Sequence, residues 1–236
     1  MEDLLHRSLP GSNREALSRA LAEAASLAGW QALDARRIKK AWRFYEAAKA
    51  AARESRDPVI LTHVTAEQTY VLLDSDQGEE ALELLRYAHR QSPGQLPHLL
   101  RAWLFAAEGE VRAVLGDRTG ALEALDRAAR YLPTDPADPA LPFLMLDETH
   151  LARWRGHCLA RLGADEAVHF LHTALDGMKE TPLGRAEAGL HVDLALALTA
   201  QGDTTEARKH ALRAADLARC TGSARQRARI ARLIGS

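Results

Sequence analysis

Four polar residues near the middle of the chain are spaced as a binding site on one helix would be. They are Asp147, His150, Arg153 and His157, and steps of three, three and four residues place them on one helix face. Arginine and protonated histidine both donate hydrogen bonds to carboxylate or phosphate oxygens. This face is therefore a candidate contact for an anionic ligand or partner. The alternative interpretation is a hydrated helix surface, because charged residues on a helix commonly face solvent.

Aromatic residues could add an apolar surface to such a site. Trp30, Tyr70 and Trp103 fall where the helix pairs described below would face inward. Aromatic rings in a groove can anchor a ligand, but the same rings could instead pack between neighbouring repeats. The candidate ligand- or partner-binding residues are Trp103, His150, Arg153, His157 and Tyr70.

Sequence patterns of known catalytic centres are absent. The chain has no Gly-rich phosphate loop, no Gly-x-Ser-x-Gly elbow and no His-Glu-x-x-His motif. His169 and His172 raise the question of a zinc site, since imidazole suits zinc, but no ligand spacing supports one. We therefore expect no catalytic residue, no metal and no cofactor, and we expect the protein not to be an enzyme.

The elements that carry these residues follow from an alanine pair that recurs five times. Successive pairs begin 40, 40, 46 and 40 residues apart, and a period of this size marks stacked supersecondary units. In four of the five pairs the residue four after the first alanine is bulky. We expect helix hairpins with the alanines where two helices approach closely. The pairs are Ala41/Ala48, Ala81/Ala88, Ala121/Ala128, Ala167/Ala174 and Ala207/Ala214.

The pattern predicts an all-α fold, a right-handed superhelical solenoid of about five hairpins with a C-terminal capping helix. Residues 1–13 are expected to form a weakly ordered leader, residues 14–236 the repeat domain and residues of about 224–233 the cap. The proline-rich insertion 133–142 explains the 46-residue step, because prolines at three-residue spacing end a helix. We expect this insertion to be ordered, since the neighbouring Leu141, Phe143 and Met145 are too apolar to be left in water.

Charge is balanced overall but unevenly distributed. The formal net charge is −1, yet residues 36–56 and 208–236 are strongly basic and the stretch between them is acidic. The basic ends are either solvated outer faces or contacts for an acidic partner or nucleic acid. No apolar run reaches the length of a membrane span, and the two cysteines suggest no disulfide framework. We expect a cytoplasmic protein without a membrane contact.

The second half of each hairpin resembles that of tetratricopeptide repeats. Gly116-Asp117, Ala121, Leu125, Ala128 and Pro133 reproduce the turn and second helix of that repeat in order. The first-helix half is degenerate, and the period of 40 exceeds the usual spacing of about 34. The resemblance implies a binding module that holds a protein, a peptide or a small-molecule ligand in a concave groove, and it leaves open a homodimer.

A narrower resemblance concerns residues 144–163. This stretch, from Leu144 to Gly163, is similar to part of the repeat region of actinobacterial transcriptional regulators, which typically follows a helix-turn-helix domain. The resemblance implies a ligand- or partner-sensing domain in transcription regulation, with a protein scaffold or adaptor as the alternative and an enzyme that uses the groove as the third option. Since nothing before residue 14 resembles a helix-turn-helix, we expect no sequence-specific DNA binding by this chain alone.

Overall fold

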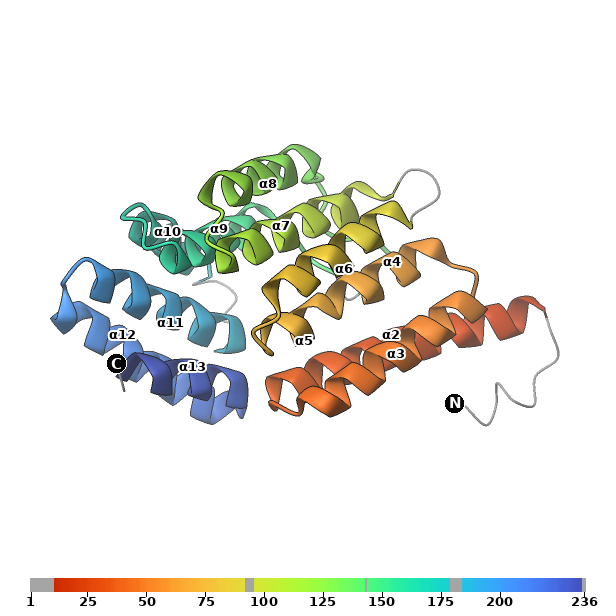
Figure 1. Cartoon of the computed structure of the whole chain (residues 1–236), viewed down its shortest axis with the longest axis horizontal. Coiled ribbons are helices and arrows are strands. Elements are labelled where there is room, and N and C mark those ends of the chain that lie inside the picture. The colour runs from red at the N-terminus through yellow and green to blue at the C-terminus, as the bar shows by residue number, and fades with distance from the viewer. Residues whose placement is uncertain (1–10, 92–95, 143, 179–183, 235–236) are drawn as a thin grey trace. The chain divides into compact units, whose positions relative to one another are not determined.

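The chain folds into helices that run antiparallel in successive pairs (Figure 1). The structure is a computed structural model that describes residues 11–91, 96–142, 144–178 and 184–234. Over these residues the only strand-like pairing is an isolated antiparallel bridge between Ala137 and Met145. The all-α architecture predicted from the sequence is confirmed.

Over the described residues, five hairpins and a terminal helix follow one another along the chain. Their bounds are α2 (Ser12–Asp34) with α3 (Ile38–Glu54), α4 (Pro58–Glu67) and α5 (Thr69–Leu73) with α6 (Gly78–Arg90), α7 (His98–Val114) with α8 (Arg118–Tyr131), α9 (Glu148–Arg161) with α10 (Ala167–Gly177), α11 (Gly184–Ala200) with α12 (Thr204–Thr221), and α13 (Ala224–Ile234). The chain divides into two compact units, Met1–Leu100 and Arg101–Ser236. Each unit is described by itself below.

The turn inside each hairpin depends on one residue in the left-handed conformation. These residues are Arg36, Asp76, Gly116, Gly163 and Gly202, with φ between 57° and 84°. Glycine adopts this conformation without strain because it has no Cβ. In the third hairpin the next residue, Asp117, then caps the second helix by accepting a hydrogen bond of 2.9 Å from the Gly120 amide. Local chemistry thus sets where the chain reverses.

The repeated alanines lie where the two helices of each hairpin approach each other. The first alanine of each pair is at most 5 % exposed, and the second is fully buried in all five hairpins. In three of the hairpins the bulky residue between them fits against a glycine of the preceding helix. A Cβ added to Gly109 would lie 2.8 Å from Leu125, and one added to Gly156 would lie 2.7 Å from Leu171. Small residues on one helix and large ones on the other therefore set the helix separation.

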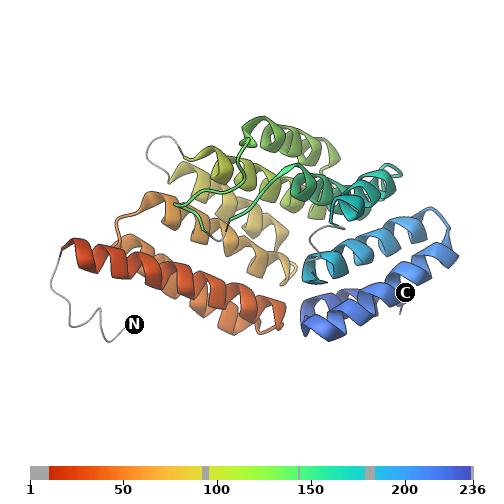
Figure 2. The same cartoon turned by 180° about the vertical axis from the view of Figure 1, so that it is seen from behind.

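The proline-rich segment between α8 and α9 is described over residues 132–142 and 144–147 (Figure 2). Leu141, Leu144 and Leu146 are buried, at 3 %, 7 % and 1 % exposure. The expectation of burial is wrong for Met145, which is 61 % exposed. In extended chain successive side chains point to opposite sides, so burial of Leu144 and Leu146 turns Met145 outward. Phe143 lies outside the described residues.

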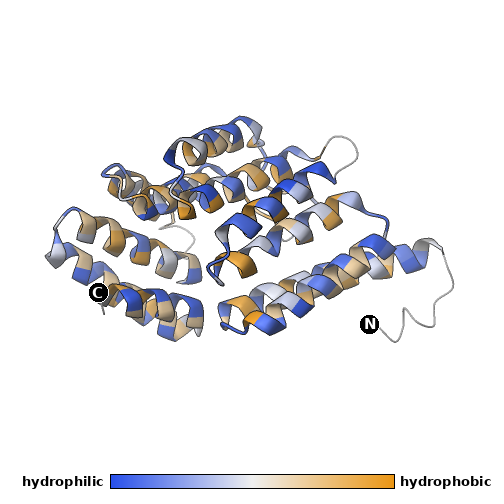
Figure 3. Cartoon of the chain, viewed as in Figure 1, coloured by the Kyte–Doolittle hydropathy of each residue, from blue (hydrophilic) through white to orange (hydrophobic). Residues whose placement is uncertain are grey.

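Each unit has its own apolar core, formed where the apolar faces of neighbouring helices meet (Figure 3). In the unit Met1–Leu100, Ala22, Ala52 and Val64 join α2, α3 and α4. In the unit Arg101–Ser236, Leu171 and Leu194 belong to a cluster that joins α9, α10, α11 and α12. Over the described residues no helix combines the length and apolar character needed to cross a membrane.

Candidate partner-binding face

In four of the hairpins, the first helix carries an aromatic or charged side chain at the same repeat position. This position comes directly after a small residue of that helix. These side chains are Trp30, Tyr70, Glu110 and His157. Within each unit the two neighbours meet. The rings of Trp30 and Tyr70 make an edge contact with centroids 6.0 Å apart, and Glu110 Oε1 lies 3.3 Å from His157 Nε2. One unit thus has an aromatic pair at this position and the other has a charged pair.

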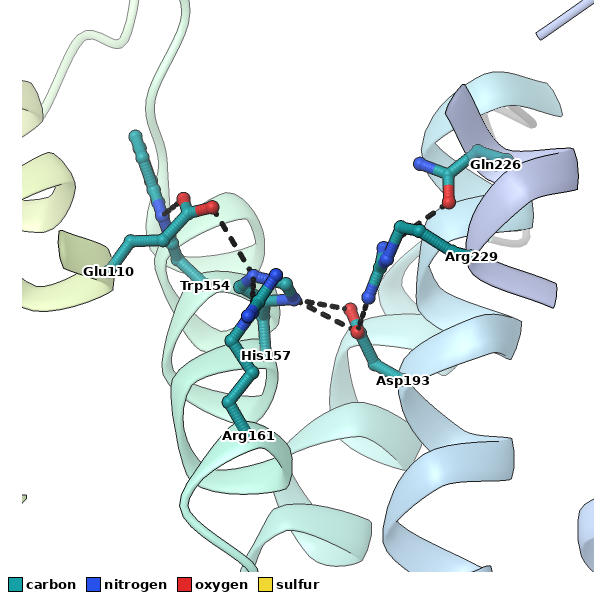
Figure 4. A network of polar contacts seen from close by, with 7 residues as sticks. All are labelled: Glu110, Trp154, His157, Arg161, Asp193, Gln226 and Arg229. Atoms are coloured by element: carbon teal, nitrogen blue, oxygen red, sulfur yellow. Dashed lines mark hydrogen bonds and ion pairs between the residues drawn. The ribbon is translucent and has the colours of Figure 1, made fainter. Parts of the chain in front are cut away.

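The charged pair belongs to a longer chain of contacts, which we name the charge ladder (Figure 4). It consists of Glu110 on α7, His157 on α9, Asp193 on α11 and Arg229 on α13. His157 Nδ1 lies 2.9 Å from both carboxylate oxygens of Asp193, and Arg229 donates to the same carboxylate. The ladder therefore connects the first helices of three hairpins to the terminal helix.

The ladder is buried and internally neutralised. The side chains of Glu110, His157 and Asp193 are 12 %, 13 % and 5 % exposed. Burial alone raises the pKa of Glu110, but the His157 charge outweighs it and holds that pKa at about 2. Burial opposes charge on His157 too, yet the carboxylates of Asp193 and Glu110 raise its pKa. Asp193 likewise has a lowered pKa despite burial, because Arg229 and His157 face it. The two carboxylates therefore favour the imidazolium form of His157.

Two neighbouring groups fix the outer end of the ladder. Trp154 donates its indole N–H to Glu110 Oε2 over 2.7 Å. Arg161 places its Nε 3.2 Å from His157 Nε2. When His157 is charged, its Nε2–H points at Glu110. The Nε2 atom then has no lone pair that could accept a hydrogen bond from Arg161. The exposed Arg161 guanidinium thus lies beside the ladder without an acceptor at its closest contact.

Positive charge is in excess on this side of the unit. The buried carboxylates of Glu110 and Asp193 face four cations, His157, Arg161, Arg225 and Arg229. Helix α13 (Ala224–Ile234), which carries Arg225 and Arg229, has two further arginines, Arg227 and Arg232, and no acidic residue. The two carboxylates are already neutralised by partners in the ladder. The exposed Arg161 at the edge of the ladder can therefore attract a further anion.

The predicted binding residues fall into different roles. Trp103 is 8 % exposed and packs edge-on against Trp154, with ring centroids 6.1 Å apart. It is thus a buried support for α9 rather than an open platform. Tyr70, at 6 % exposure, belongs to the unit Met1–Leu100 and packs with Trp30. For both aromatic pairs, packing between repeats describes the contact better than a groove anchor does.

The three predicted residues on α9 do lie on one helix. Asp147 caps its start, accepting from the His150 backbone N–H, and lies 2.7 Å from the His150 ring nitrogen. Arg153 is half-buried one turn further on, and His157 is the central member of the ladder. The interpretation as a hydrated helix surface is therefore wrong for His157.

Sequence reasoning missed the acidic members of the ladder and its terminal arginine. Glu110 could have been found by aligning the repeats, because it occupies the same position as His157. Asp193 is the only acidic residue in the apolar second half of α11, a signal for a buried charge with a partner. Arg229 gave no such signal, since it is one of four arginines on α13.

Metal binding finds no support in this part of the molecule. No group of three or more histidine, cysteine, aspartate or glutamate side chains could hold a metal ion among the described residues. His169 is exposed and contacts the Phe170 ring, while His172 faces His210. Cys158 and Cys220 are free thiols, one buried and one exposed.

A hollow of about 450 Å³ lies elsewhere, along the first turns of α12. It is open to solvent and contains none of the predicted binding residues. Its lining consists of Thr204, Thr205, Arg208, Lys209 and Leu212.

Comparison with known proteins identifies the fold. No protein family model matches the chain, and no curated protein matches it. Among solved structures, it is similar to the crystal structure of nearly identical TPR-like repeats from a putative kinesin light chain of Podosopora anserina. The TM-score is 0.51 at 16 % sequence identity, over 91 % of this chain and 99 % of the other. The chain therefore has a TPR-like helical repeat fold, as its second-helix motifs predict.

Proposed function

We propose that this chain is a non-catalytic binding module that recognises an acidic segment of a partner protein. The contact surface is the face of the unit Arg101–Ser236 that carries the charge ladder. The observation that carries the proposal is the excess of positive charge there, because Arg161 and Arg225 lie beside two carboxylates that His157 and Arg229 already neutralise. TPR-like repeats suit such a role because stacked helix pairs present an extended surface.

The buried charges themselves support a recognition role. Apolar residues of similar volume commonly stabilise a fold as well as a buried ion pair does, so stability alone gives little reason for the ladder. Fixed charges do hold neighbouring side chains in place. In this unit they fix the Glu110 and Asp193 carboxylates, and the Asp193 carboxylate in turn fixes the position of Arg229. A rigid set of donors loses less entropy on binding than mobile surface arginines do.

The predicted residues on α9 extend this surface. Arg153 lies one turn before His157 on the same helix. His150 lies at the start of the same helix. The proposal therefore keeps His150, Arg153 and His157 in the binding face and assigns Trp103 to its support.

The biological role of this binding module is a prediction. The resemblance of residues 144–163 to regulators favours a sensing domain, whereas a scaffold or adaptor would use the same face to assemble proteins. Nucleic acid is the other anionic partner that the charge distribution suggests, but it would neutralise a long basic track rather than a short cluster. We favour an acidic protein segment because the cations gather around one ladder.

The test uses fluorescein-labelled peptides whose binding is followed by anisotropy. One peptide alternates glutamate and alanine, and its counterpart has glutamine in place of each glutamate. We expect the purified protein to bind the acidic peptide and not the glutamine peptide. Arg161→Gln should weaken binding roughly fivefold, since a partly exposed ion pair is worth about 1 kcal/mol. The same substitution at the exposed Arg86 on α6, which pairs with Glu83 over 2.6 Å, is the matched control.

Three outcomes would contradict the proposal. The first is equal affinity for the acidic and glutamine peptides. The second is an equal loss for Arg161→Gln and Arg86→Gln, which would reveal only a general charge effect. The third is a random-sequence DNA duplex that displaces the acidic peptide at physiological salt and depends on Arg161, which would assign the face to nucleic acid. Unchanged helical circular dichroism in both variants ensures that the comparison concerns binding.

A further inference from the structure

Three histidines from three helices meet on the side of α11 that faces away from the charge ladder. His191 and Asp193 are two residues apart, which places them about 200° apart around the helix. His191 contacts His210 on α12, with ring centroids 5.0 Å apart. The His210 ring in turn lies 5.9 Å from that of His172 on α10. We name His172, His191 and His210 the histidine cluster.

The geometry of the inner pair depends on its protonation. His191 Nδ1 lies 2.8 Å from His210 Nδ1, a distance that requires one ring nitrogen to donate and the other to accept. If both rings were protonated, two N–H groups on two cations would point at each other. His191 is 7 % exposed, so little water could screen that repulsion. The contact is therefore compatible with at most one positive charge.

The surroundings offer little compensation for a second proton. On α11, Glu187 Oε1 lies 3.8 Å from His191 Nε2 but accepts a 2.8 Å hydrogen bond from Arg213 of α12. Also on α12, Glu206 lies near His210 but pairs with Lys209 over 2.8 Å. On α10, the facing titratable group is His172, which adds positive charge when protonated. Each acidic group near the pair thus already has a cation.

We propose that the histidine cluster is a proton-operated switch in which protonation of both His191 and His210 loosens the packing of α11 against α12 and α10. Helix α11 also carries Asp193, so loosening it disturbs the charge ladder on the opposite side. The switch lies within one unit and does not depend on the partner proposed above. Neutral and slightly alkaline solution keeps the cluster closed, and acidification opens it.

The direction of the effect agrees with the titration of the pair. Burial and the neighbouring His210 lower the pKa of His191 to about 4, and burial and His172 lower the pKa of His210. A histidine whose pKa is lowered in the folded state contributes stability that is complete at a pH above its ordinary pKa of about 6.5. This contribution falls as the pH drops toward the pKa of the folded state. If the His191 pKa is about 4 in the closed state and 6.5 in the open state, protonation at pH 5 shifts the equilibrium between them toward the open state about 30-fold.

The experiment measures amide hydrogen exchange in α11 and α12 at pH 7.5 and pH 5, corrected for the intrinsic exchange rate and with EDTA present. In the wild-type protein we expect protection to fall about 30-fold at the lower pH. His191→Asn keeps one uncharged hydrogen bond to His210 and removes one titrating ring. It should therefore lose less protection at pH 5 than the wild-type protein does. His169→Asn, at an exposed position on α10, should behave like the wild type.

Two results would overturn the switch. One is a wild-type protein whose α11 and α12 protection is the same at both pH values. The other is a His191→Asn variant that loses as much protection as the wild type. If His191→Asn does not fold, imidazole NMR of the wild-type protein decides instead. We expect His191 to titrate well below pH 6, and an ordinary titration midpoint for both His191 and His210 would refute the proposal.

Discussion

Replacing His157 by glutamine tests the charge ladder most sharply. The substitution removes a cation whose two ring nitrogens face Asp193 at 2.9 Å and Glu110 at 3.3 Å. A glutamine amide can donate toward one of these carboxylates but carries no charge. Asp193 keeps Arg229, and Glu110 keeps the indole N–H of Trp154. The variant therefore leaves two buried carboxylates with incomplete compensation.

The expected cost follows from the loss of one partner of a buried ion pair. Such losses amount to about 3–5 kcal/mol of unfolding free energy. The pH dependence is specific. Because the pKa of His157 is raised in the folded state, its contribution is complete below about pH 6.5 and disappears as the pH rises through the folded value. Because the pKa of Glu110 is lowered to about 2, its contribution is complete above about pH 4.5 and fades toward that value.

The assay is urea unfolding followed by circular dichroism, at about pH 5.5 and about pH 9. His157→Gln should lose most stability relative to the wild type at the lower pH, with a smaller gap at the higher pH. His169→Gln, on the exposed face of α10, is the control and should cost little at either pH. A loss for His157→Gln that is the same at both pH values, or below 1 kcal/mol at pH 5.5, would refute the assignment of a buried imidazolium.

Substitutions at three further positions test the packing and the turns of the hairpins. Gly156→Ala should destabilise the fold despite the better helix propensity of alanine, because its Cβ would lie 2.7 Å from Leu171; equal or higher thermal stability would show that Leu171 yields easily. Ala121→Leu should overpack a fully buried position and cost about 1–3 kcal/mol, so an unchanged melting temperature would contradict close helix approach there. Gly116→Ala should cost about 1–2 kcal/mol from its φ of 77° alone, and Gly116→Asn less, as urea unfolding would measure; the reverse order would exclude backbone strain as the cause.

The fold could be predicted because its information is local and repeated. An alanine pair and a bulky residue between them recur in the same order, and the burial of both alanines follows from helix geometry. The prediction was wrong at Met145, because the helical period gives no information on which way a side chain points in an extended segment. The repeat pattern also gave no sign of the division between Leu100 and Arg101.

The candidate site could be predicted only in part, because its members come from different hairpins. The spacing along α9 identified His150, Arg153 and His157, since all three share one helix. The partners of His157 lie 47 residues before it, at Glu110, and 36 residues after it, at Asp193. Contacts between hairpins depend on how whole repeats align with one another. The proline-rich segment before α9 lengthens one repeat and shifts this alignment. Aligning the repeats by their helical glycines rather than by the alanines would have paired Glu110 with His157.

The most direct test of the proposed binding face is hydrogen exchange of the wild-type protein with and without the acidic peptide, at physiological salt and neutral pH. Under these conditions the histidine cluster is closed and the charge ladder is complete. We expect added protection in α9 and α13, which carry Arg161 and Arg229, and little change in α3 and α6. Protection confined to α12, around the hollow lined by Arg208 and Lys209, or to the unit Met1–Leu100 would contradict the account, because the ladder would then play no part in recognition.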